Sequence, residues 1–189
     1  DGVVEVTPDG LLLKGAEKPT WASPYLWSGL KDVQVTARLK LDAPPAKGVF
    51  GIKFGHTWAI VGLGPRLAFS DGKASFPAAG AAGAVDVAVP VGEWFTVKGW
   101  YSFDDGVFEA ALNDKPILKA AMPAEPFEDF MKTFGRPAPL AGIGVFAEGC
   151  DVRVGEFSFL AGAPRRRIVV MGDSISQQAY WVLELEKAL

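Results

Sequence analysis

Hydrophobic and polar residues alternate strictly along residues 32–42, DVQVTARLKLD. The positions of one face are apolar: Val33, Val35, Ala37, Leu39 and Leu41. Those of the other face are polar: Gln34, Thr36, Arg38 and Lys40. Because successive side chains of a β-strand point to opposite faces, the pattern predicts a strand with one buried and one solvated face, as antiparallel sheets have. Residues 151–159, DVRVGEFSF, repeat the pattern.

Shorter apolar runs fill most of the remaining chain up to about residue 160. We expect strands at 48–55, 57–63, 66–70, 85–89, 94–102, 107–112, 117–121 and 141–147. Residues typical of hairpin connections separate several of them, at 71–72, 104–106 and 113–116. Residues 125–132, EPFEDFMK, favour a short helix. About a dozen short strands with almost no helix predict a mainly β, antiparallel two-sheet sandwich.

The pattern changes after residues 161–164, AGAP. Ile168 to Met171 are apolar at every position, which is typical of a parallel strand covered on both faces. Residues 176–189 then have the spacing of an amphipathic helix. A strand, a tight turn and a helix are the beginning of an α/β unit. We therefore expect two parts: a sandwich at 1–162, and a linker with the start of a second domain at 163–189.

Composition narrows the classes of partner and of site. The net charge of −3 gives no electrostatic reason to expect nucleic acid or an anionic membrane as a partner. Cys150 is the only cysteine and His56 the only histidine, so an intrachain disulfide and a cysteine-based metal site are excluded. We expect neither a metal nor a cofactor. The sequence has no run of about 18 apolar residues, so it predicts no membrane-spanning helix.

The first residue is Asp1, and no signal-like segment follows it. We expect a secreted or periplasmic protein whose leader has been removed, with a shortened chain as the alternative.

Three segments resemble, in their order, a concanavalin A-like (laminin G-like) jelly roll. They are WSGLKDVQVTARLKL at 27–41, GEWFTVKGWYSFDDGVFEAALNDKPI at 92–117 and AGIGVFAEGCDVRVGEFSFL at 141–160. In that family the middle segment forms two long strands and a hairpin, and the last segment returns beside the amino-terminal strands. The resemblance covers residues 3–160 and implies the fold, which by itself does not determine the function.

Glycosidases of this fold carry closely spaced carboxylates on one strand, and no Glu-x-Asp-x-x-Glu occurs here. The acidic group at Glu125, Glu128 and Asp129 fits a solvated helix surface. The sequence therefore disfavours a glycosidase.

Sugar binding fits the sequence better, because exposed aromatic rings can stack on sugar faces. Trp21, Tyr25 and Trp27 lie in PTWASPYLW, which is less regular than its neighbours, and are the candidate ligand-binding residues. The alternative is that Trp21 and Trp27 cap one end of the sandwich.

Other chemistry-bearing residues have structural explanations. We assign Trp58, Trp94 and Trp100 to the core or the sheet surface, His56 to a turn and Cys150 to a small, partly buried thiol. A hairpin explains Asp104 and Asp105 without a Ca²⁺ ion.

Residues 172–175, GDSI, follow the apolar strand and strongly resemble the first conserved block of the SGNH (GDSL-type) hydrolases. These are serine esterases and lipases on a flavodoxin-like α/β sheet. The resemblance implies that Ser174 is the nucleophile and that its backbone N–H contributes to the oxyanion hole, while Asp173 matches a family Asp outside the triad. A helix start at the end of a parallel strand favours developing negative charge. The alternative is a capping box between Ser174 and Gln177.

The later blocks of that family supply a Gly and an Asn to the oxyanion hole and an Asp-x-x-His pair to activate the serine. His56 lies in the predicted sandwich, so we expect this chain alone to be inactive. The expected parent is an esterase acting on a carbohydrate ester or another acylated small molecule, completed by a longer chain or by a separate polypeptide. The alternative is a non-catalytic glycan-binding or interaction module.

Overall fold

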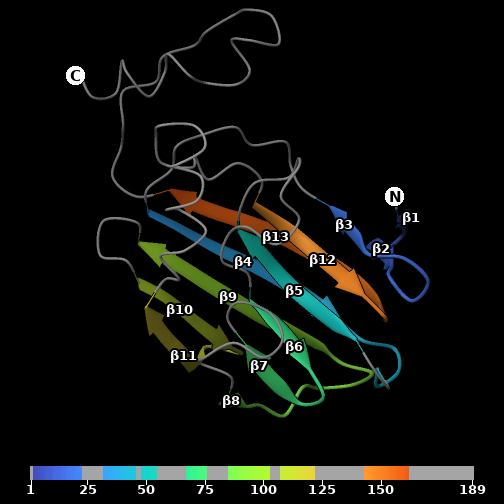
Figure 1. Ribbon diagram of the computed structural model, residues 1–189. Coiled ribbons are helices and arrows are strands. Elements are labelled where there is room, and N and C mark those ends of the chain that lie inside the picture. Colours follow the sequence, from blue (N-terminus) through green and yellow to red (C-terminus); the bar gives the residue numbers. More distant parts are fainter. Residues whose placement is uncertain are drawn as a thin grey trace, which may run out of the picture.

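The computed structural model describes residues 2–22, 32–45, 48–54, 67–75, 85–102, 107–121 and 143–161. In these ranges the chain forms thirteen strands and no helix, and every pair of neighbouring strands is antiparallel. The strands lie in two layers (Figure 1). The predicted antiparallel β-sandwich is therefore confirmed for the described part of the chain.

One layer is a seven-stranded sheet with the order β1-β2-β13-β4-β9-β10-β11. Its strands are β1 (Val3–Thr7), β2 (Gly10–Lys14), β13 (Asp151–Ala161), β4 (Asp32–Lys40), β9 (Trp94–Ser102), β10 (Val107–Leu112) and β11 (Lys115–Ala121). The last strand, β13, pairs with β2 and β4, as the jelly-roll resemblance implies. The apolar face predicted from residue 33 to residue 41 is at most 1% exposed, so the expected burial is confirmed.

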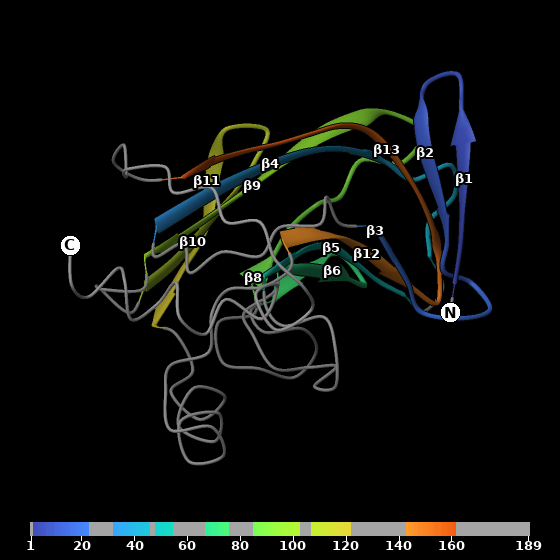
Figure 2. The ribbon, with the colours of Figure 1, turned by 90° about the horizontal axis from the view of Figure 1, so that it is seen from above.

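The other layer is a six-stranded sheet with the order β3-β12-β5-β6-β7-β8. Its strands are β3 (Thr20–Ala22), β12 (Ile143–Glu148), β5 (Val49–Phe54), β6 (Ala68–Ser70), β7 (Lys73–Ser75) and β8 (Val85–Asp86). Figure 2 shows the longer sheet curving over the shorter one. The strand predicted at 85–89 is shorter than expected, because only its first two residues pair with β7.

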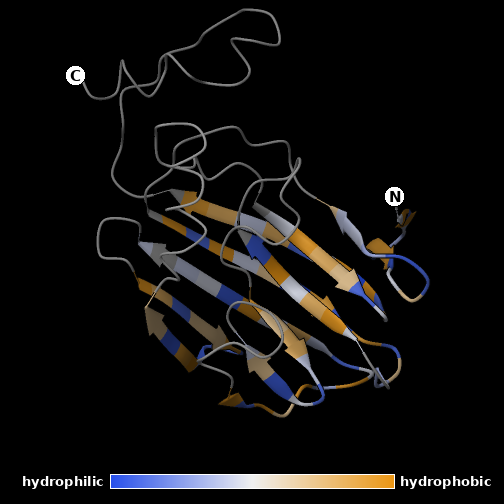
Figure 3. Ribbon diagram, in the orientation of Figure 1, coloured by the Kyte–Doolittle hydropathy of each residue, from blue (hydrophilic) through white to orange (hydrophobic). Residues whose placement is uncertain are grey.

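The core fills the space between the two layers. Phe50 of the six-stranded sheet stacks on Phe69 with ring centroids 5.7 Å apart, and it meets the edge of Phe95 across the sandwich at 6.3 Å. All three rings are at most 1% exposed. Hydrophobic and hydrophilic positions alternate along the strands (Figure 3), as expected where each sheet turns one face to the core.

Two predicted turns have the geometry that closes a two-residue hairpin. Asp71 and Gly72 both have positive φ, 49° and 75°, and so do Asn113 and Asp114, 47° and 63°. Such pairs form type I′ turns, whose twist matches that of the flanking strands. The predicted turn at 113–116 was too long: Lys115 and Pro116 belong to β11. A proline is tolerated there because β11 is the last strand of its sheet.

Several predicted elements lie outside the described residues. They are the strand at 57–63, the connection at 104–106, the helix at 125–132 and the α/β segment at 163–189. The domain boundary near residue 162 therefore stays a prediction.

Candidate functional site

The structure places Trp21 in β3, at the edge of the six-stranded sheet. The sequence placed Trp21 in a stretch less regular than its neighbours, and of this stretch residues 20–22 form a strand that pairs with β12 in regular register. Trp21 lies opposite Phe146, on the face turned away from the core. The indole is 43% exposed whereas Phe146 is 6% exposed. Trp21 is thus a large aromatic surface available to solvent beside a buried ring.

Lys53 of β5 places its ammonium group over this indole, with Nζ 5.5 Å from the ring centroid. The two residues are separated by β12, where the residue opposite Lys53 is Gly144. Because Gly144 has no side chain, the lysine side chain has room to cross that strand and reach Trp21. A cation above an aromatic face is attracted by its quadrupole, by about 0.5–1 kcal/mol at exposed sites.

Glu148 of β12 lies on the other side of Trp21 from Lys53. It is exposed and lies two residues beyond Phe146, so by alternation it belongs to the same face. Diagonal neighbours in an antiparallel pair are about 7–8 Å apart, within reach of long side chains. The arrangement presents an indole, an ammonium donor and a carboxylate acceptor on one surface. Such a set can stack on the apolar face of a sugar and bond its hydroxyl groups.

The residues in the middle of this outer face are buried. Gly51 and Ala68 belong to the same row as Trp21 and are buried, and so is Ser75 on β7. A Cβ at Gly51 would overlap the carbonyl oxygen of Leu67, so glycine is required where β5 and β6 approach each other. Among the described residues of this face, the exposed aromatic ring therefore lies at the β3 end.

A second indole, Trp94, lies on the outer face of the seven-stranded sheet. A Cβ at Gly155 would lie 3.0 Å from Cζ3 of Trp94, so the ring packs against the bulge in β13. Arg38 lies over the same ring, 5.1 Å from its centroid, and forms an ion pair with Glu156 at 3.5 Å. Trp94 is therefore held between sheet and arginine, and its assignment to the sheet surface is confirmed.

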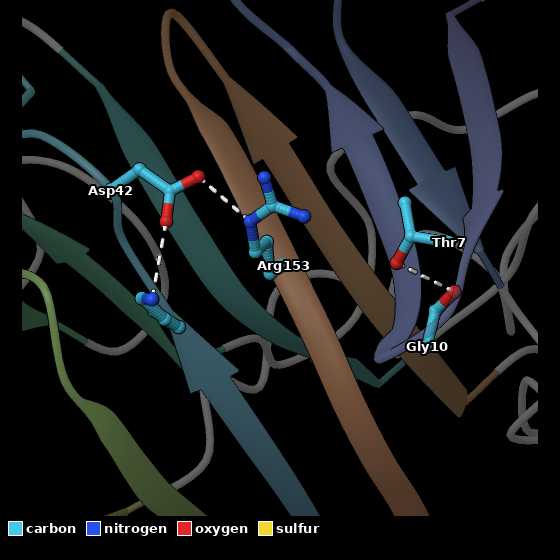
Figure 4. Close-up of polar contacts among 5 residues, drawn as sticks. Thr7, Gly10, Asp42 and Arg153 are labelled. Carbon is cyan, nitrogen blue, oxygen red and sulfur yellow. Dashed lines mark hydrogen bonds and ion pairs between the residues drawn. The ribbon is translucent and has the colours of Figure 1, made fainter.

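Ion pairs cover much of the outer face of the seven-stranded sheet. Arg153 Nε donates to Asp42 Oδ2 at 2.7 Å, and Lys40 Nζ lies 3.6 Å from Asp42 Oδ1 (Figure 4). The Arg153 hydrogen bond, together with both cations, holds the pKa of the Asp42 carboxyl below its ordinary value. Figure 4 also shows Thr7 Oγ1 donating to the carbonyl of Gly10 at 3.2 Å, within the β1–β2 turn. These contacts hold strands together.

Cys150 is the one cysteine, and it is 6% exposed. Burial raises the pKa of its thiol to about 11, so it stays protonated at neutral pH. The prediction of a small, at least partly buried thiol is confirmed. Among the described residues, no group of three or more His, Cys, Asp or Glu could hold a metal ion. The same part of the chain has no helix able to cross a membrane.

The remaining candidate residues fall outside the described ranges. Tyr25, Trp27 and His56 do so, and so does Ser174 with the whole GDSI block. The sequence had indicated Trp21 but not Lys53 or Glu148. Alternation puts Lys53 on the same face of β5 as Gly51 and Glu148 on the same face of β12 as Phe146, and only the register across β12 brings them beside Trp21.

No protein-family model and no curated protein matches the sequence. Several solved structures are similar in fold. A carbohydrate binding module, CBM66, from Bacillus subtilis has 12% identity and a TM-score of 0.61, covering 84% of this chain and 91% of its own. The metal-free Emp46p carbohydrate recognition domain has 8% identity and a TM-score of 0.60, covering 87% and 88%.

A Bacillus subtilis protein of unknown function with a galectin-like fold has 14% identity and a TM-score of 0.56, covering 88% of this chain and 89% of its own. At such identities the likeness concerns the fold, and nothing in these comparisons supports the SGNH resemblance of residues 172–175. The described chain has the galectin-like and concanavalin A-like β-sandwich fold.

Proposed function

We propose that the sandwich is a glycan-binding module whose ligand stacks on Trp21. The observation that carries this proposal is the exposed indole at the β3 edge, flanked by Lys53 and Glu148 on the same face. Lys53 supplies donors and Glu148 acceptors for sugar hydroxyl groups, while the ring covers an apolar sugar face. The fold neighbours named for carbohydrate binding agree with this function.

A glycan array probed with the fluorescently labelled chain, followed by titration calorimetry on the best ligand, tests the proposal. Trp21→Ala is expected to weaken binding by about tenfold or more, since central aromatic anchors usually cost at least about 2 kcal/mol. The matched control is Trp94→Ala, which removes an indole from the other sheet and leaves affinity unchanged. Equal losses in both variants, or no bound glycan at all, would overturn the proposal.

The two flanking side chains have separable roles. Lys53→Met keeps the length of the side chain and removes the donors, whereas Glu148→Gln keeps acceptor capacity on one atom and removes the charge. We expect each change to weaken binding by less than Trp21→Ala does. A gain in affinity for Glu148→Gln would identify that carboxylate as a group that repels the ligand.

A second candidate function rests on the sequence of residues 168–189. We propose that the parent protein is an SGNH-type esterase for a carbohydrate ester or another small ester, with Ser174 as nucleophile and the sandwich as its accessory domain. The support is the order of an apolar run, GDSI and an amphipathic stretch. The parent is proposed to be secreted or periplasmic.

A serine-reactive fluorophosphonate, applied to the full-length protein and followed by peptide mass spectrometry, tests this second function. We expect the label on Ser174 and its loss in Ser174→Ala. Labelling of another serine with Ser174 unmodified would contradict the assignment. Failure here leaves the glycan-binding proposal intact, because Trp21 and Ser174 are assayed by different reactions.

A further inference from the structure

The first strand, β1, is the outermost strand of the seven-stranded sheet (Figure 2). Within the described ranges it pairs with β2 alone, in a register without a bulge from Val3↔Lys14 to Thr7↔Gly10. Three of its five residues are exposed valines: Val3 at 53%, Val4 at 41% and Val6 at 86%. An apolar strand thus presents the N–H and C=O groups of one edge to solvent.

Natural edge strands normally carry a device that prevents pairing with another strand, such as a lysine, a proline or a bulge. The sequence of β1, VVEVT, contains none of these. Its one charged residue, Glu5, forms an ion pair with Lys14 at 2.6 Å on the outer face. Within the described ranges, nothing in the strand itself therefore hinders pairing at this edge.

Two of the valines face the core side of the sheet. Val4 lies opposite Leu13 and Val6 opposite Leu11, and Leu13 is fully buried. The apolar row of the core therefore continues onto β1, where its last residues are exposed to solvent. Covering these side chains would remove apolar surface from water, which favours association.

We propose that β1 pairs antiparallel with β1 of a second copy of this chain, with Val4 opposite Val4. Opposite residues of an antiparallel pair point to the same face. A two-fold axis midway between the two copies of Val4 pairs them with each other. It also places Val6 of one copy opposite Gly2 of the other, and Glu5 opposite Val3. The inner face then carries one apolar row across four strands: Leu13, Val4, and the Val4 and Leu13 of the second copy.

Charge selects this register over the neighbouring one. An axis midway between the two copies of Glu5 would place the two glutamates directly opposite each other, which is destabilising. The axis between the two copies of Val4 keeps the glutamates apart and places Glu5 of one copy opposite Val3 of the other. Val3 is itself opposite Lys14, so Glu5 of one copy lies on the same face as Lys14 of the other, with Val3 between them. The edge is complementary to itself in this register.

The small size of the interface limits the strength of association. A pair of five-residue strands buries less than the roughly 1,200–2,000 Å² of stable protein interfaces. The dimer is therefore weak and depends on concentration, and it joins the two seven-stranded sheets into one continuous sheet.

Disulfide trapping in the full chain tests the register. Val4→Cys should form a disulfide-linked dimer under a mild oxidant, because directly opposite Cβ atoms are about 4.5–5.5 Å apart, close to the distance a disulfide needs. Val6→Cys, whose opposite residue is Gly2, is the matched control and should trap far more slowly. The unchanged chain reports the background from the buried Cys150. Equal trapping of both variants would overturn the proposed register.

Sedimentation velocity up to about 1 mM, the dissociation range of weak complexes, tests the dimer itself. Val4→Lys should weaken association at least tenfold, since it places two ammonium groups opposite each other. The control Val91→Lys changes a valine that is 42% exposed and lies outside β1, and it should associate as the unchanged chain does. A chain that sediments as a monomer throughout, or equal effects of the two lysines, would overturn the proposal.

Discussion

The outer faces of the two sheets of the sandwich differ in how far their residues are exposed to solvent. In the seven-stranded sheet, β4 alternates between fully buried valines and solvated polar residues, and ion pairs such as Arg38–Glu156 cover the outer face. In the six-stranded sheet, Gly51, Ala68 and Phe146 face away from the core and are nevertheless buried.

This difference has a counterpart in the sequence pattern. A strand with one wet face shows a period of two, whereas a strand buried on both faces has no such contrast. The strands of β6, β7 and β8 are also only two or three residues long. Among the described residues, the exposed aromatic ring on the outer face of the six-stranded sheet is Trp21 at the β3 end, where we propose that a ligand binds.

The largest expected effect concerns the contact that joins the sheets. Phe50→Ala removes a ring that touches Phe69 in its own sheet and Phe95 in the other. Truncation of a buried phenylalanine typically costs about 3–5 kcal/mol. Urea unfolding followed by fluorescence measures the loss. A change below about 1 kcal/mol, the usual size of a surface effect, would show that the sheets do not share this core.

The next effect compares a glycine in the closely packed six-stranded sheet with a glycine that has open space around it. Gly51→Ala places a methyl group against the carbonyl of Leu67, whereas Gly92→Ala meets nothing within 4 Å. Both glycines have positive φ, 149° and 79°, so both variants carry backbone strain. We expect Gly92→Ala to lower the free energy of unfolding by about 1–2 kcal/mol, and Gly51→Ala to lower it by more. The reverse order in thermal melts would refute the close approach of β5 and β6.

A smaller effect tests the ion pairs of the seven-stranded sheet. Because the pKa of Asp42 is lowered in the folded state, its contribution is present above the ordinary carboxyl pKa and is lost as pH falls through the folded value. Asp42 is 52% exposed, so Asp42→Asn should cost less than about 1 kcal/mol at neutral pH. Unfolding curves at neutral and acid pH should show the difference between variant and parent disappearing in acid. A difference that persists in acid would assign the effect to packing.

The smallest expected effect compares the sandwich with the segment beyond it. Deletion of residues 163–189 should leave the thermal midpoint nearly unchanged, because all thirteen described strands lie before residue 162. Removing the apolar run at 168–171 should also improve solubility. Differential scanning calorimetry of both chains measures the midpoint. A large fall would show that the segment belongs to the sandwich core and would refute the predicted boundary.

The sequence by itself determined the strands that have one wet face and the turns between them. The valines of β4 and the turn pairs Asp71–Gly72 and Asn113–Asp114 are local signals, since alternation and positive φ need no distant partner. The jelly-roll resemblance also predicted the return of β13 beside β2 and β4. Trp21 was recognised as a candidate because an aromatic residue near prolines stands out in composition.

Only the tertiary structure decided which residues surround Trp21. Lys53 and Glu148 lie 32 and 127 positions further along the chain, and they meet Trp21 because β12 inserts between β3 and β5. The same holds for the exposed edge of β1, whose valines resemble those of a buried strand in sequence. Register and sheet order depend on pairing between distant segments, and a sequence pattern read locally carries no measure of that pairing.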